Sequence, residues 1–145
     1  MGRREEPTDD VVRWSERAEQ SLLASIMCDP DKFLVVDGIA EEADLYSERH
    51  RAIYHAVRAV YERSGVVSME TLAEELRLTR KMDAIGGPDY LVTVLDSSSS
   101  GVHTVHWANI VRNFSQKRQV ERALMVGLDA VRRSGPTTSG RSETG

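Results

Sequence analysis

Apolar residues recur along the middle of the chain at intervals of three and four positions, which is the spacing of one face of an α-helix. Capping residues, prolines and glycines fall between these runs, where helix ends are expected. The pattern predicts six helices between Ser15 and Arg133. We therefore expect an all-α fold, a small bundle of about five helices followed by one long C-terminal helix.

The first predicted helix begins after an N-cap at Ser15 and runs to about Cys28, because Asp29-Pro30 stops it. Its apolar side is expected to bury Cys28 as a small filler. A second, short helix is predicted from Pro30 to about Ala40, broken near Gly38.

Ser47 is the predicted cap of a third helix that ends near Ser64, with Gly65 supplying a left-handed C-terminal turn. The aromatic Tyr46 before this cap is expected to pack against the first turn of the helix. A fourth helix is predicted from Met69 to about Lys81, behind a cap at Ser68. The Gly86-Gly87 turn then precedes a fifth helix that opens at Pro88 and runs through Leu95.

The last predicted helix, from about Val102 to Arg133, contains no proline, and Gly127 is its only glycine. At about 1.5 Å per residue it would be roughly 45 Å long, which exceeds the width of a 100-residue globule. We therefore expect its apolar stripe to meet a partner. The interface candidates on it are Trp107, Ile110, Val111, Phe114, Leu124 and Leu128. The alternative is a helix broken near Gln116 that folds back on itself.

These elements divide the chain into four predicted segments. They are a disordered N-terminal segment at 1–14, a helical globular subdomain at 15–101, the long helix at 102–133 and a disordered tail at 134–145.

Composition narrows the class of protein. The chain has 145 residues, enough for one domain, and only 6% aromatic residues, so the core must come from aliphatic side chains on helices. The net charge of −4 is unevenly distributed, with sums of −5 over residues 1–65, −3 over 66–102 and +4 over 103–145. This basic excess is too small to predict direct DNA contact.

The sequence predicts no catalytic residue, no cofactor and no metal site. No glycine is followed by lysine, so a phosphate-binding P-loop is absent, and His103 and His106 have no third ligand at a recognisable spacing. The single cysteine excludes an intramolecular disulfide framework. With no secretory signal or apolar span, we expect a cytoplasmic protein without membrane attachment that is not an enzyme by itself.

Three short stretches occur in an order that resembles a known family. They are Ala18-Glu19-Gln20-Ser21-Leu22-Leu23, then Leu45-Tyr46-Ser47-Glu48-Arg49-His50-Arg51-Ala52-Ile53-Tyr54, then Gly86-Gly87-Pro88-Asp89-Tyr90-Leu91. Together with the helices between and after them, they resemble the N-terminal domain of the bacterial and phage replicative DNA helicases, the DnaB-like family, over residues 18 to 131. The family-like structural positions are Ala18, Glu19, Gln20, Leu22, Tyr46, His50, Ile53, Gly86, Gly87, Tyr90 and Leu91.

The resemblance implies a helical globule followed by a helical hairpin. In the family these domains pair through their hairpins into a collar on a hexameric motor, and the collar docks the C-terminal domain of primase and can contact the helicase loader. The P-loop motor domain is missing from this sequence, and the match ends with the first hairpin helix, so pairing cannot simply be carried over. An apolar stripe left without its second helix would be exposed, and such stripes usually bind a partner.

We therefore predict a non-catalytic DNA-replication module that acts by docking to itself, a replicative helicase or a primase, in primosome assembly or its modulation. A truncated remnant without function is compatible with the same sequence. The alternative from another class is a small helix-turn-helix-like DNA-binding regulator, with residues 68–81 as its first helix. Residues 82–95, which would form the turn and the second helix, contain no Lys or Arg. They therefore offer no basic side chain to contact bases or phosphates.

Overall fold

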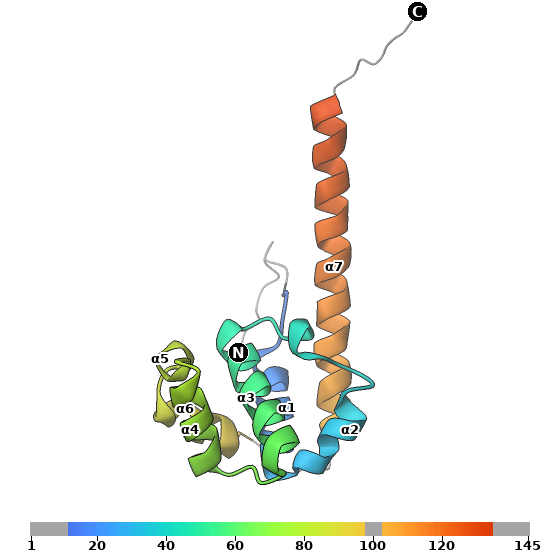
Figure 1. The fold of residues 1–145 in the computed structure, drawn as a ribbon. Coiled ribbons are helices and arrows are strands. Elements are labelled where there is room, and N and C mark those ends of the chain that lie inside the picture. Colours follow the sequence, from blue (N-terminus) through green and yellow to red (C-terminus); the bar gives the residue numbers. More distant parts are fainter. Residues whose placement is uncertain (1–11, 98–102, 135–145) are drawn as a thin grey trace, which may run out of the picture. The chain divides into compact units, whose positions relative to one another are not determined.

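The computed structural model describes residues 12–97 and 103–134, and these residues form helices and turns without a strand (Figure 1). The all-α fold is thereby confirmed. The elements are α1 (Glu16–Cys28), η1 (Pro30–Lys32), α2 (Phe33–Val36), η2 (Glu42–Asp44), α3 (Glu48–Ser64), α4 (Met69–Leu78), α5 (Met82–Ile85), α6 (Pro88–Asp96) and α7 (Thr104–Ser134).

Helix α1 lies at the centre of the globule, where it packs against α3 and α6. The Ser15 hydroxyl accepts a hydrogen bond from the Ala18 N–H at 3.0 Å, which confirms the predicted N-cap. Leu22, Leu23 and Ile26 are fully buried. Each contributes about 1.5–3 kcal/mol relative to an exposed side chain, so α1 supplies much of the apolar contact that holds the bundle together.

The second predicted helix is shorter than expected. After the turn η1, α2 makes a single turn and ends at Val36 rather than near Ala40. Its Phe33 ring packs edge-on against Tyr54, with the ring centroids 5.3 Å apart. The prediction that Cys28 is buried is wrong: the apolar side of α1 ends at Met27, and Cys28, the last residue of the helix, is exposed.

Helix α3 has the predicted bounds. Gly65 adopts φ +72°, and its N–H donates to the Tyr61 carbonyl at 2.8 Å, so the left-handed turn after Ser64 is confirmed. The start differs in detail, because Ser47 is the N-cap residue but its side chain makes no capping bond.

Helix α4 ends at Leu78, three residues before the predicted end at Lys81. Arg80 takes the left-handed conformation at φ +61°, and the Lys81 N–H donates to the Leu76 carbonyl at 2.8 Å, which closes a Schellman turn. A short helix, α5, then follows that the sequence pattern did not predict, and it buries Ile85 completely. Because glycine usually occupies this turn, an arginine there gave no sign of a helix end.

The turn before α6 is as predicted. Gly86 and Gly87 have φ +100° and +83°, values that favour glycine, and Pro88 is the first residue of the helix. Leu91 and Val94 on α6 are fully buried.

Helix α7 is continuous from Thr104 to Ser134, so the alternative of a break near Gln116 is not observed. The chain divides into two compact units, one ending at Ser115 and the other beginning at Gln116. The predicted disordered ends lie outside the described residues except for 12–14 and Ser134.

Candidate docking interface

The first half of α7 is bound into the globular unit. Thr104, Ala108, Val111 and Ser115 recur on one helix face and are at most 3% exposed. Trp107 and Ile110 lie beside this face, half-buried against the core, and Phe114 is also half-buried. Val111 is therefore a core residue, and of the predicted interface residues in this half only the exposed parts of Trp107, Ile110 and Phe114 remain available.

A buried carboxylate, Asp44, fixes this half of α7 to the turn η2. Its Oδ1 accepts hydrogen bonds from the Ser115 hydroxyl at 2.7 Å and from the Arg112 guanidinium at 3.2 Å, while Oδ2 accepts the Glu41 N–H at 2.7 Å. Asp44 is 5% exposed, so these bonds offset the cost of burying its charge. No local pattern predicts this contact, because Asp44 and its partners on α7 are about 70 positions apart.

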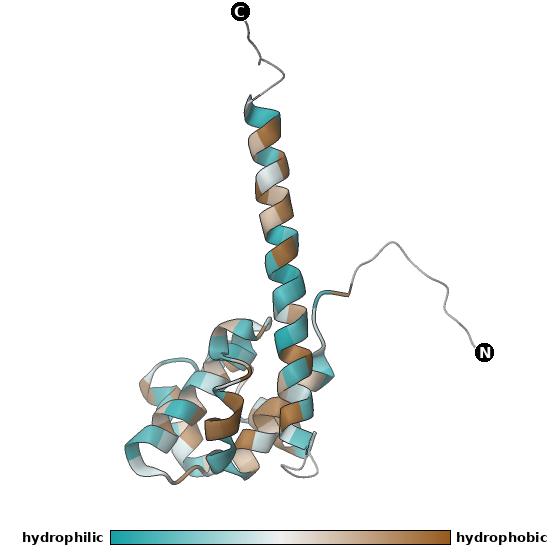
Figure 2. Cartoon of the chain, turned by 90° about the vertical axis from the view of Figure 1, so that its right-hand side faces the viewer, coloured by the Kyte–Doolittle hydropathy of each residue, from teal (hydrophilic) through white to brown (hydrophobic). Residues whose placement is uncertain are grey.

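Hydrophobic positions alternate with hydrophilic ones along the second half of α7 (Figure 2). The large apolar side chains in the unit that begins at Gln116 are exposed. Leu124 is 69% exposed and Leu128 is 47% exposed, one turn apart on the same helix face. Val120 and Val131, at 59% and 67%, extend that face in both directions. We refer to Val120, Leu124, Leu128 and Val131 as the apolar face of α7.

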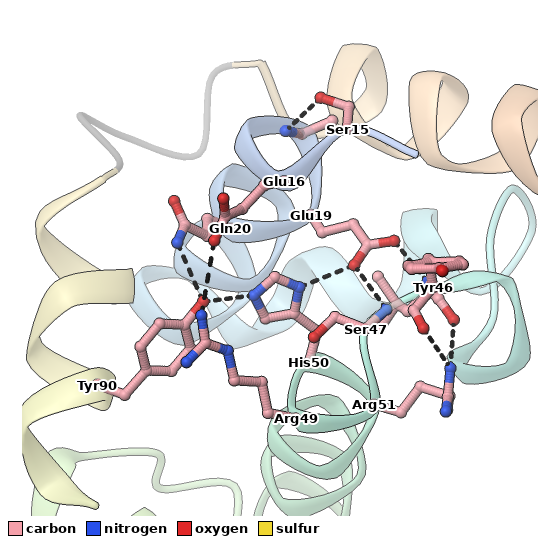
Figure 3. Close-up of polar contacts among 12 residues, drawn as sticks. Ser15, Glu16, Glu19, Gln20, Tyr46, Ser47, Arg49, His50, Arg51 and Tyr90 are labelled. Atoms are coloured by element: carbon pink, nitrogen blue, oxygen red, sulfur yellow. Dashed lines mark hydrogen bonds and ion pairs between the residues drawn. The ribbon is translucent and has the colours of Figure 1, made fainter. Parts of the chain in front are cut away.

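The three family-like stretches meet in one hydrogen-bond network (Figure 3). Glu19, 2% exposed, accepts the backbone N–H of Tyr46 at 2.6 Å on Oε2. Its Oε1 accepts the N–H of Ser47 at 3.2 Å and lies 2.8 Å from His50 Nδ1. The carboxylate thus holds the backbone at the start of α3 in place of a conventional serine cap.

His50 continues the network to α6 (Figure 3). With Nδ1 donating to Glu19, its Nε2 accepts the Tyr90 hydroxyl at 2.6 Å, and that hydroxyl also accepts from Gln20 Nε2 at 3.0 Å. The Arg49 guanidinium lies 3.7 Å from the centroid of the Tyr90 ring. Because His50 is fully buried and both of its nitrogens are bonded, the network joins α1, α3 and α6 without an unsatisfied ring nitrogen.

The other family-like positions have structural roles. Ala18, Leu22, Ile53 and Leu91 are in the core, and Gly86 and Gly87 form the turn before Tyr90. The ring of Tyr46, the residue before the cap, lies partly in solvent. It is 45% exposed and stacks on Trp14, with ring centroids 5.0 Å apart, while its backbone N–H is bonded to Glu19.

None of these groups forms a recognisable catalytic or metal centre. Over residues 12–97 and 103–134 there is no cluster of three His, Cys, Asp or Glu side chains that could hold a metal, and His103 and His106 are both exposed. No helix in this part of the chain is long and apolar enough to cross a membrane. Helix α6, which a helix-turn-helix would use for recognition, contains no Lys or Arg, so this alternative lacks the charged donors that most base and phosphate contacts use.

Comparison with known proteins gives a consistent result. The family model described as "DnaB-like helicase N terminal domain" matches residues 12–113. Similar proteins include the replicative DNA helicase DnaB of Geobacillus stearothermophilus, 30% identical over 108 residues (74% of this chain, 24% of the relative). The replicative DNA helicase DnaC of Bacillus subtilis is 28% identical over 105 residues (72% of this chain, 23% of the relative).

A similar solved structure is the crystal structure of the N-terminal domain of DnaB helicase from Mycobacterium tuberculosis. The two structures superpose with a TM-score of 0.76 at 25% sequence identity, and the match covers 88% of each chain. The chain spans about a quarter of the length of the curated relatives named above, 24% and 23%.

Proposed function

Because the chain belongs to the DnaB-like helicase N-terminal domain family, we propose that it is a non-catalytic DNA-replication module that docks on another protein through the apolar face of α7. The match covers only the N-terminal domain of the relatives, and their motor regions have no counterpart among the matched residues. Catalysis is therefore no part of the proposal.

The exposure of the apolar face is the observation that carries this proposal. Leu124 and Leu128 are 69% and 47% exposed although they share one helix face. Burying the exposed parts of these two leucines contributes about 2–3 kcal/mol before the cost of association is subtracted. Val120 and Val131 enlarge the same face. An amphipathic helix recognises a partner by packing such an aligned row of apolar side chains against it.

The proposed partners are a second copy of the chain, a replicative helicase, the C-terminal domain of a primase and a helicase loader. Two roles use the same face. The chain either supplies the collar part of a helicase assembly or competes with the collar for primase and so reduces primosome assembly. A cytoplasmic location follows from these partners.

A capture experiment tests the proposal. The full chain is immobilised. The replicative helicase, the primase and the helicase loader of the same organism are then passed over it one at a time. We expect at least one of them to be retained by the wild-type chain, and the combined L124D/L128D variant to lose about tenfold or more in affinity, the equivalent of 1.4 kcal/mol.

The matched control is V126D on the same helix. Val126 is 67% exposed, as Leu124 is, but two positions further along it lies on the opposite side of the helix, about 200° away. V126D therefore introduces one aspartate of the same kind without touching the apolar face, and we expect it to bind like the wild type. Equal losses for both variants would refute the proposal. So would the capture of none of these three proteins by a chain that also stays monomeric.

A further inference from the structure

Three basic side chains lie together where α4 is followed by α5 (Figure 1). Arg77 is in the last turn of α4, Arg80 is in the turn after it, and Lys81 is the residue before α5. All three are exposed. The turn keeps them close together, because the Arg80 N–H donates to the Arg77 carbonyl at 3.1 Å and the Lys81 N–H donates to the Leu76 carbonyl at 2.8 Å. We refer to Arg77, Arg80 and Lys81 as the basic corner.

The side chains of the basic corner have no partner inside the domain. Over residues 12–97 and 103–134, none of the three forms an ion pair or a hydrogen bond through its side chain. Six other arginines of the unit that ends at Ser115 do have side-chain partners, and they are Arg17, Arg49, Arg51, Arg58, Arg63 and Arg112. The cations of the basic corner are therefore available to an anion from outside the domain.

The backbone does not account for an arginine at position 80. Its φ of +61° lies in the left-handed region, which glycine adopts with less strain than a residue that has a side chain. The side chain offsets none of this strain through an ion pair or hydrogen bond within the described part of the chain. Residues held in this conformation are frequent at binding sites, where the side chain makes its contact with a ligand.

A surface hollow adjoins the basic corner. Its volume is about 460 Å³, and it is lined by Arg77, Arg80, Met82 and Asp83. Leu78, which stands between the two arginines in the sequence, is 72% exposed. The surface thus combines two guanidinium groups with the apolar side chains of Leu78 and Met82. An occupant that matches it carries both negative charge and apolar groups.

The carboxylates of a protein fit this surface better than the phosphates of a nucleic acid. A guanidinium group binds both oxygens of a carboxylate through two parallel hydrogen bonds. Negative charge flanks the basic corner, because Glu74 lies one turn before Arg77 and Asp83 lines the hollow. A short acidic peptide can place its carboxylates on the three cations and end there, whereas a long polyanion has to pass the flanking carboxylates.

We propose that the basic corner binds an acidic segment of a partner protein, in which aspartate or glutamate side chains alternate with apolar ones. The carboxylates of the segment pair with the three cations, and an apolar side chain packs on Leu78 and Met82. The basic corner is formed by α4 and the turn after it, not by the apolar face of α7. The inference therefore goes beyond the proposed function and does not depend on it.

Peptide binding to the full chain tests the proposal. The probe is a fluorescein-labelled synthetic peptide in which pairs of aspartates are separated by single leucines, and fluorescence anisotropy gives its dissociation constant. We expect saturable binding that weakens as salt is added. The R77Q/R80G variant should bind the peptide about tenfold or more weakly than the wild type.

Two checks separate loss of binding from loss of the fold. Glycine adopts the left-handed turn freely, so R77Q/R80G should keep the circular dichroism spectrum of the wild type. R77Q/K81Q leaves the turn residue Arg80 in place and should also weaken peptide binding about tenfold. A folded R77Q/R80G or R77Q/K81Q variant that binds the peptide like the wild type would overturn the proposal.

The matched control is R122Q/R132Q, which removes two positive charges from exposed positions of α7. It should bind the acidic peptide like the wild type. A second peptide, with asparagine in place of every aspartate, should not bind. The proposal is overturned if the control weakens binding as much as R77Q/R80G, if the neutral peptide binds equally well, or if the acidic peptide does not bind at all.

A DNA titration distinguishes the two classes of polyanion. Single-stranded and duplex oligonucleotides with the same label are titrated into the full chain at the same salt concentration. We expect them to bind more weakly than the acidic peptide. Tighter binding of DNA that is lost in R77Q/R80G would assign the basic corner to nucleic acid and would contradict a peptide site.

Discussion

Replacing the buried Glu19 with glutamine should destabilise the domain more than any single substitution on its surface. Glu19 accepts three hydrogen bonds, from the Tyr46 N–H and the Ser47 N–H and from the ring of His50. Glutamine has nearly the same shape but only one acceptor oxygen. If this oxygen keeps the Ser47 and His50 bonds, the amide NH₂ must face the Tyr46 N–H, so two donors meet where a 2.6 Å bond stood.

The expected cost follows from these contacts. One bond to a charged acceptor is lost, one buried donor is left without a partner, and the two remaining bonds lose their charge assistance, which together amounts to about 2–4 kcal/mol. Against a typical total of about 5–15 kcal/mol, this is a large part of the stability of a small domain.

The assay is urea unfolding followed by circular dichroism on the full chain. We expect E19Q to shift the midpoint to lower urea while the slope of the transition stays unchanged, because the same surface is exposed on unfolding. The control is E74Q at an exposed position of α4, which should stay within about 0.5 kcal/mol of the wild type. The reasoning is refuted if E19Q and E74Q unfold at the same urea concentration as the wild type.

Three further predictions test other contacts. Y90F removes the hydroxyl that bonds His50 and Gln20 and keeps the ring, so it should cost about 1–3 kcal/mol in the same assay. S115A removes the 2.7 Å bond to Asp44 and should cost about 1–2 kcal/mol, and an unchanged urea midpoint would contradict the role given to this contact. Burial raises the pKa of Tyr54 above its usual 10.0, so the phenol ionises first in the unfolded chain, and stability should fall as the pH rises beyond about 10. Y54F should make that alkaline decline shallower, and identical slopes for the two proteins would count against this explanation.

The sequence predicted those helices whose boundaries are marked by local chemistry. Ser15, Gly65 and Pro88 act on their own neighbours, and α1, α3 and α6 accordingly begin or end where expected. The prediction failed where the boundary has no such mark. Arg80 adopts a left-handed conformation that glycine usually adopts at the end of a helix. The sequence pattern therefore predicted neither the early end of α4 nor the helix α5.

The sequence also identified the residues of the hydrogen-bond network but not their arrangement. Glu19, His50 and Tyr90 stand in separate stretches, and their order along the chain indicated a family without indicating a contact. Helical periodicity likewise placed Val111 on the docking stripe with Leu124. Periodicity shows which residues are apolar on one side of a helix, but it does not show which part of that side the rest of the protein covers.

Hydrogen exchange along α7 tests most directly whether its apolar face is a docking surface. Amide exchange is measured on the full chain at low concentration, at high concentration, and in mixtures with the replicative helicase, the primase or the helicase loader. We predict that residues 120–131 gain protection in every state in which a complex forms, and that the L124D/L128D variant gains none. A complex that forms while the exchange of these residues stays as fast as in the isolated chain would contradict the account.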